Sequence, residues 1–100
     1  MPNRDIKQLE SKTQRQIIEY LDTIPNLYFF KVLTANVRGV PDIIACYKGR
    51  FIGLEVKSSL NKATAIQCWN IGEILGAGGI DKIVRSVDDV KRILDEVGHE

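Results

Sequence analysis

The stretch that decides the fold is VPDIIACYKGRFIGLEVK, residues 40–57, in which two apolar runs flank Lys48-Gly49-Arg50. The runs at residues 42–47 and 51–57 are rich in β-branched and aromatic residues, which favours strands. A connection this short predicts an antiparallel hairpin. Because successive side chains of a strand point to opposite faces, Glu55 and Lys57 should share one face, while Leu54 and Val56 point to the other.

The flanking sequence predicts helices and two further strands. Apolar residues three or four apart predict a first helix that ends before Pro25, and its start is open: Asn3 could cap it, or Ser11 with Gln14 could form a capping box. A second capping box, Thr64 with Gln67, opens a helix that stops at the glycines after residue 75. The remaining predicted elements are strands at residues 27–33 and 80–87 and a helix from residue 88 to Gly98. The order α-β-β-β-α-β-α implies an α/β fold with a mixed sheet and helices on its faces.

Composition restricts the class of protein. The chain has 100 residues, of which 44% are hydrophobic and 27% charged, so one globular domain over residues 1–100 is expected. The first ten residues are polar, and no run approaches the roughly 18 apolar residues of a membrane span, so we expect a cytoplasmic protein without a membrane partner. Cys46 and Cys68 lie among apolar neighbours and are expected to be buried, reduced thiols. With His99 as the sole histidine, they make a zinc site improbable.

Charge is unevenly distributed along the chain. The formal net charge is only +1, yet residues 1–62 carry ten Lys and Arg against six Asp and Glu, and residues 63–100 carry four against seven. The first part is therefore the basic one. Its acids Glu10, Asp42 and Glu55 would be neutralised in part by a divalent cation, which would leave a more positive face for phosphates.

The hairpin also brings two carboxylates and a lysine to one edge of the sheet. If the turn is centred on Gly49, residue 42 pairs roughly with residue 56, and the carboxylates of Asp42 and Glu55 can lie close together beside Lys57. Carboxylates can hold Mg²⁺ or Mn²⁺, which polarises a phosphoryl oxygen and acidifies bound water. A lysine can orient that water and offset developing charge. This combination is typical of phosphodiester hydrolysis.

The motifs in their order resemble the VRR-NUC family of the PD-(D/E)XK nuclease superfamily. The resemblance covers nearly the whole chain, and its motifs are a helix with Glu10 and Gln14, the Arg-Gly-Val-Pro-Asp run at residues 38–42, the Gly-Arg turn, Leu-Glu-Val-Lys at residues 54–57, Gln67 with Trp69, and a later Gly-Gly. It implies a restriction-endonuclease-like core and a Mg²⁺- or Mn²⁺-dependent endodeoxyribonuclease. It further implies a free-standing bacterial or phage enzyme that acts on branched DNA such as four-way (Holliday) junctions.

The candidate site residues fall into two groups. The catalytic candidates are Asp42, Glu55, Lys57, Glu10 and Gln67, of which Asp42, Glu55 and Glu10 are the expected metal ligands. The expected DNA contacts are Arg38, Lys12, Arg15, Lys62 and Gln14. Glu10 is preferred over Glu19 because nine residues of helix turn a side chain to the opposite side. Gln67 has a structural alternative as the capping partner of Thr64.

Several alternatives stay open at this level. Asp42 could be a turn residue after proline, and Glu55 could form an ion pair with Lys57 or Arg50. Trp69 and the aromatic run at residues 28–30 are more typical of a core than of base-stacking platforms. The whole chain could be a non-catalytic nucleic-acid-binding or regulatory module, or a nuclease of flaps and duplex ends. Paired cuts in a junction predict a two-fold homodimer, which a small core would also favour.

Overall fold

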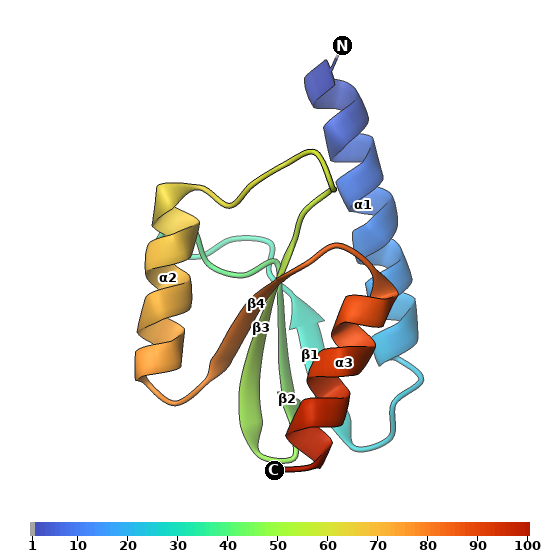
Figure 1. Cartoon of the computed structure of the whole chain (residues 1–100), viewed down its shortest axis with the longest axis vertical. Coiled ribbons are helices and arrows are strands. Elements are labelled where there is room, and N and C mark those ends of the chain that lie inside the picture. Colours follow the sequence, from blue (N-terminus) through green and yellow to red (C-terminus); the bar gives the residue numbers. More distant parts are fainter. Residues whose placement is uncertain (1) are drawn as a thin grey trace.

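The computed structural model describes residues 2–100, with side chains from residue 6 onward. Figure 1 shows a central sheet with α2 on one side and with α1 and α3 on the other. The elements follow in the order α1 (Pro2–Leu21), β1 (Leu27–Lys31), β2 (Ile43–Tyr47), β3 (Arg50–Val56), α2 (Ala65–Gly76), β4 (Ile80–Val84) and α3 (Val87–Gly98). The sheet has the strand order β1-β2-β3-β4; β3 pairs in parallel with β4, and the other two pairs are antiparallel. The predicted mixed α/β architecture is confirmed.

The hydrophobic core lies between the sheet and the pair α1 and α3. The alternation of side chains along β2 and β3 sends one set of apolar residues to this side, where α1 and α3 bury their own apolar stripes against them. The buried core residues are Ile17, Leu21, Ile43, Ala45, Ile52, Leu54, Val56, Val84, Val90, Ile93, Leu94 and Val97. The opposite face of the sheet is covered only in part, because each residue of α2 keeps some exposure.

The hairpin turn sets the register on which the functional residues depend. Lys48 and Gly49 both have positive φ, 54° and 78°, the conformation of a two-residue turn whose twist matches its strands. Tyr47 therefore pairs with Arg50, and Ile43 pairs with Leu54. Continued by one residue, this register sets Asp42 opposite Glu55 rather than opposite residue 56. The predicted pairing of residue 42 with residue 56 was therefore wrong by one position.

Several element boundaries differ from the predictions. Helix α1 runs without interruption through Ser11, which excludes the Ser11 capping box as the start of the helix and favours the alternative of an earlier start; the helix ends at Leu21. Strand β1 stops at Lys31 and β4 at Val84, each shorter than predicted. Helix α3 begins at Val87, because the hydroxyl of Ser86 accepts a hydrogen bond from the Asp89 N–H and caps it.

Aromatic residues that were expected in the core are exposed. By register Tyr28, Cys46 and Phe51 lie in one row on the side of the sheet away from α1 and α3, and Phe30 lies in the next row. Tyr28 is 69% exposed, Phe30 45% and Phe51 42%; we call these three residues the aromatic face. Trp69 on α2 is also exposed, whereas Phe29 packs against the core as predicted.

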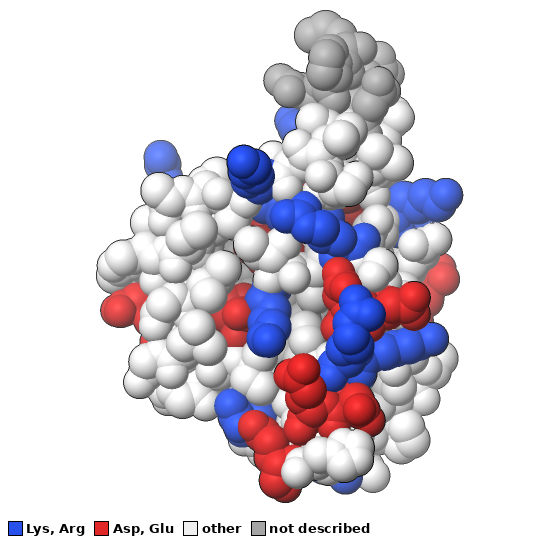
Figure 2. All heavy atoms as spheres, in the orientation of Figure 1, with Lys and Arg blue, Asp and Glu red and all other residues white. Residues whose placement is uncertain are grey.

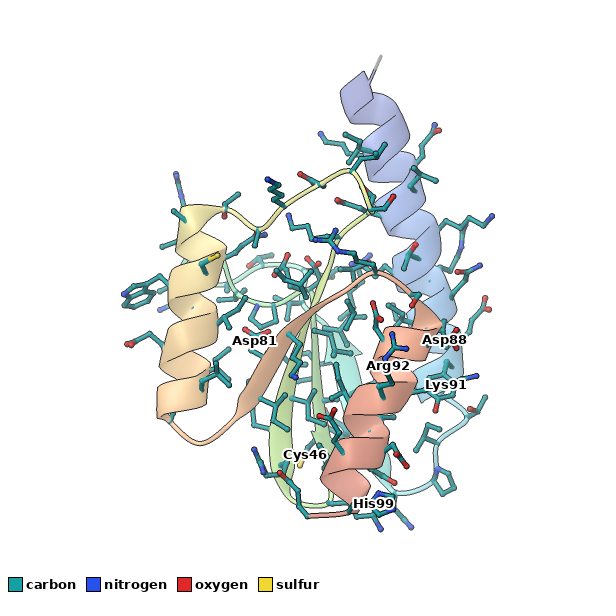
Figure 3. All side chains as sticks on the ribbon, in the orientation of Figure 1. Cys46, Asp81, Asp88, Lys91, Arg92 and His99 are labelled. Carbon is teal, nitrogen blue, oxygen red and sulfur yellow. The ribbon has the colours of Figure 1, made fainter. Side chains whose placement is uncertain are left out.

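The prediction for the cysteines was wrong as to burial. Both are exposed, and in the described chain both are free thiols. Cys46 lies on the sheet face that α2 leaves open (Figure 3), which explains its exposure despite its apolar neighbours.

Within residues 2–100, none of the helices has the length and apolarity required to cross a membrane.

Candidate active site

An acidic pair forms where β2 begins and β3 ends. The Asp42 carboxylate accepts a hydrogen bond from the Val56 N–H at 2.8 Å, which holds it against the end of β3. Glu55 is only 3% exposed and projects from β3 on the face opposite the core residues Leu54 and Val56. The predicted convergence of these two acids on one face is therefore confirmed.

Burial and the proximity of Asp42 change the ionisation of Glu55. Burial, together with the negative charge of Asp42 and a hydrogen bond between the two carboxyl groups, raises the pKa of Glu55 to about 8, and the Lys57 ammonium partly opposes this rise. A carboxyl–carboxylate hydrogen bond requires a shared proton. A divalent cation could take the place of that proton and offset the same repulsion.

Lys57 lies immediately beyond β3 and is also buried, at 8% exposed. Its backbone N–H donates to the Val84 carbonyl at 3.0 Å, so the parallel pairing of β3 and β4 continues to this residue. Its ammonium is close enough to Glu55 to lower the pKa of that carboxyl. The structure thus brings Asp42, Glu55 and Lys57 together, as predicted.

Gln67 makes the capping contact considered for it and also contacts the acidic pair, while its catalytic role stays a prediction. Its side-chain oxygen accepts from the Thr64 N–H at 2.8 Å, which completes the capping box of α2, while its amide nitrogen donates to Glu55 at 2.8 Å. The first turn of α2 is therefore coupled to the acidic pair. The capping role explains why the glutamine has a single orientation, with its N–H₂ group toward Glu55.

Glu10 points toward the segment after β3 but contacts its backbone and Asn61. Its carboxylate accepts from the Ser58 N–H at 3.3 Å and from the Asn61 amide at 2.8 Å. Glu19 is exposed, so the predicted opposition of the two glutamates on α1 is confirmed. Among the described residues, however, no group of three or more Asp, Glu, His or Cys side chains is arranged to hold a metal ion. The structure thus does not gather Glu10 with Asp42 and Glu55, and its role as a ligand stays a prediction.

Two glycines allow the loop before Asp42 to pack closely against its neighbours. Gly39 has a φ of +78°, and a Cβ there would lie 2.9 Å from the backbone of Ile66, so only glycine lets the loop before Asp42 pack against α2. A hydrogen bond from the Asn70 amide to the Arg38 carbonyl, at 2.9 Å, fastens the same loop. A Cβ on Gly53 would lie 2.6 Å from Pro41, which precedes Asp42. Glycine at these positions fixes where Asp42 enters the sheet.

Asp81 is a buried acid that the motif analysis missed. It is 4% exposed, pairs with Gly53 in the sheet and projects from β4 (Figure 3). Burial and the charge of Asp42 raise its pKa to about 6, while a hydrogen bond from the Lys82 N–H opposes the rise. One signal was present in the sequence: an aspartate interrupts the apolar strand Ile80–Val84, and a glycine stands inside the neighbouring strand.

The donor set of the acidic pair fits Mg²⁺ or Mn²⁺. Asp42 and Glu55 offer only oxygen atoms, which these cations prefer, and Mg²⁺ is commonly held by one or two carboxylates while it keeps several waters. Burial is the largest cause of the raised pKa of Glu55, and the negative charge of Asp42 raises it further. Both features agree with a site for a hard divalent cation.

The predicted DNA-contact residues are accessible at the surface. Lys12, Arg15, Arg38 and Lys62 are exposed, and Gln14 is half-buried beside them on α1. Figure 2 shows Lys and Arg side chains across the upper part of the visible face, near the loop between β3 and α2, and acidic side chains lower down over α3. Lysine and arginine side chains also lie among these acids, so the separation of charge along the sequence is not kept in space.

The comparison with solved structures supports the fold. No family model matches the sequence. No curated protein matches it either. Among solved structures, one described as "VRR_NUC domain" aligns with a TM-score of 0.73 and 19% identity over 87% of this chain and 95% of its own. Another, "VRR_NUC domain protein", aligns with a TM-score of 0.73 and 18% identity over 86% of this chain and 84% of its own.

Proposed function

We propose that this chain, which has the fold of the VRR_NUC domain, is a metal-dependent nuclease of the VRR-NUC family. The observation that carries the proposal is the convergence of Asp42, Glu55 and Lys57 at the end of β3, on the sheet face opposite the core. An acid pair in which one member, Glu55, is buried and has a raised pKa is, in a fold of this kind, a candidate functional site.

Each side chain of the site would have a different role in phosphodiester hydrolysis. A divalent cation at Asp42 and Glu55 would supply a Lewis acid and an acidified water. Lys57, held in a buried position next to Glu55, can orient the attacking water and offset the charge that develops on phosphate. Gln67 keeps the Glu55 carboxylate in place through its amide, and Glu10 orders the segment that follows Lys57.

The substrate we propose is DNA, and within DNA a branched structure such as a four-way junction. The exposed basic residues Lys12, Arg15, Arg38 and Lys62 can bind phosphates without reading sequence, which suits recognition of DNA shape. A junction needs cuts in two strands related by symmetry. We therefore propose a homodimer with two-fold symmetry as the working form.

Labelled substrates test the proposal. The protein is incubated with Mg²⁺ or Mn²⁺ and duplex, flap, single-stranded or four-way junction DNA, and the products are separated by size. We expect cleavage that needs the cation and favours the junction. Asp42→Ala, Glu55→Ala and Lys57→Ala should each abolish it, because each removes charge stabilisation of several kcal/mol from the transition state.

The same experiment includes a control variant and results that would contradict the proposal. Glu19→Ala alters an exposed carboxylate on the far side of α1 and should cleave normally. Undiminished cleavage by Asp42→Ala would refute the site assignment. Cation-independent binding of DNA with no cleavage of any substrate would favour the non-catalytic module, and preference for flaps or duplex ends would remove the junction specificity.

A further inference from the structure

Asp81 is a carboxylate whose position the packing of the fold does not explain. It lies on β4 next to Gly53 and is 4% exposed, yet its Oδ1 atom is buried with no hydrogen-bond partner in the described structure. A buried carboxylate with an unpaired oxygen destabilises a fold, because its lost hydration is not replaced. An apolar residue at this position of β4 would pack at lower cost.

The neighbouring strand keeps space around this carboxylate. A Cβ on Gly53 would lie 2.9 Å from Asp81 Oδ1 and 2.6 Å from the Pro41 ring, so the glycine leaves room for both. Gly53 and Glu55 lie on the same face of β3, and Asp81 in the paired strand faces the same side. The unpaired oxygen is therefore directed into the region where the acidic pair lies.

The charge of Asp81 also reaches that pair. Burial is the largest cause of the raised pKa of Glu55 and of Asp81; the charge of Asp81 adds to the first rise, and the charge of Asp42 adds to the second. The Asp81 carboxyl group, near the start of β4, is therefore close enough to interact electrostatically with Asp42 and Glu55. Asp81, Asp42 and Glu55 do not form a group that could hold an ion directly. Asp81 would therefore affect a cation without being one of its direct ligands.

We propose that Asp81 is a positioning residue for the cation site, which strengthens the hold of Asp42 and Glu55 on a hydrated divalent cation by its negative charge and by accepting a hydrogen bond at Oδ1. This inference rests on the proposed function, because it assumes a cation at the acidic pair. Outer carboxylates of this kind orient the direct ligands and the water of a metal site, and their loss commonly lowers metal affinity about 10- to 100-fold.

Binding of Mn²⁺ alone, without DNA, tests the inference. Free Mn²⁺ is measured by its electron paramagnetic resonance signal in a titration of the whole protein, and a parallel thermal melt with and without Mn²⁺ reports stability. Asp81→Asn keeps the shape and removes the charge; Asp81→Ser, a smaller neutral residue, serves if the asparagine variant folds poorly. Glu73→Gln, which alters an exposed carboxylate of α2, is the matched control, and Asp42→Asn locates the site.

We expect Asp81→Asn to weaken Mn²⁺ binding about 10- to 100-fold and to reduce the stabilisation by Mn²⁺, while Glu73→Gln changes neither. A purely structural role would alter the melting temperature and leave Mn²⁺ affinity unchanged, and that result in both Asp81 variants would overturn the inference alone. A wild-type protein that binds no Mn²⁺, or one whose binding survives Asp42→Asn, would overturn the proposed cation site and this inference with it.

Discussion

Glu55 shows at the scale of one residue how the candidate active site opposes the stability of the fold. Its pKa of about 8 in the folded protein lies above the ordinary value of 4.5, so between these values the folded chain keeps a proton that the unfolded chain has lost. Raising the pH through this window therefore favours unfolding. Asp81 acts in the same direction between 3.8 and about 6.

The first prediction follows from this loss of stability with rising pH. With chelator present, the melting temperature should fall as the pH rises from about 5 to about 8, and Glu55→Gln should remove most of the fall above about pH 6, where Asp81 has already ionised. Differential scanning calorimetry over a pH series measures this, with Glu19→Gln as control. An equal fall in the Glu55→Gln protein would mean that this carboxyl ionises normally.

A second residue-scale prediction concerns Asp42. Asp42→Asn should stabilise the metal-free protein at neutral pH, because it removes the charge that repels Glu55 and Asp81. It should also weaken the rise in melting temperature that Mg²⁺ or Mn²⁺ produces by mass action. Thermal melts with chelator and with a cation series measure both effects. A cation-induced rise equal to that of the wild-type protein would contradict the role of Asp42 as a ligand.

At the scale of elements, the first turn of α2 links helix stability to the acidic pair. Thr64→Ala should cost about 1 kcal/mol of stability through the lost cap but leave cleavage largely intact. Gln67→Glu keeps an oxygen for the Thr64 N–H, but it replaces the amide donor to Glu55 with a carboxylate. Urea denaturation and cleavage rates should therefore separate the two variants: Thr64→Ala mainly loses stability, and Gln67→Glu mainly loses cleavage. Equal cleavage by both would mean that the contact with Glu55 has no catalytic role.

Helix α1 allows a similar comparison between its two sides. Glu10→Ala should reduce cleavage, because it removes the acceptor that orders Ser58 and Asn61 directly after Lys57. Glu19→Ala should be nearly silent because its side chain is exposed. Single-turnover cleavage rates at saturating cation measure the difference. Comparable losses in both variants would contradict the assignment of the functional side of α1.

How far the sequence predicts the structure depends on the range of the interaction involved. Local patterns predicted the hairpin, the α2 capping box and the shared face of Glu55 and Lys57, because each is decided within a few residues. The register was missed by one residue because it depends on the backbone of Lys48 and Gly49. Asp81 was missed because its position near the candidate site depends on the pairing of its strand with Gly53, which is distant in the chain. The exposure of Cys46 depends on how little of the sheet α2 covers.

At the scale of the whole molecule, the aromatic face is unlike the surface of a typical monomer. Tyr28, Phe30 and Phe51 lie on one side of β1 to β3 with exposures of 69%, 45% and 42%. Large contiguous apolar patches are uncommon on monomers and often mark interfaces. A two-fold axis near this face would bury the patch of one copy against the same patch of the next and supply a second active site.

The last prediction is that the protein is a homodimer and that Tyr28→Ser with Phe30→Ser converts it to a monomer without unfolding it. Both side chains lie outside the core, so their loss should cost little stability within one copy. Light scattering at micromolar concentration gives the mass, and a junction carried in a plasmid shows whether its two nicks are made in one encounter. Leu33→Ser, which alters an 82% exposed residue beyond the end of β1, is the control. We expect paired nicks from the dimer and single, uncorrelated nicks from the double variant. A monomeric wild-type protein with uncorrelated nicks would leave the proposed nuclease chemistry intact and remove junction resolution, because two symmetric cuts then have no structural basis.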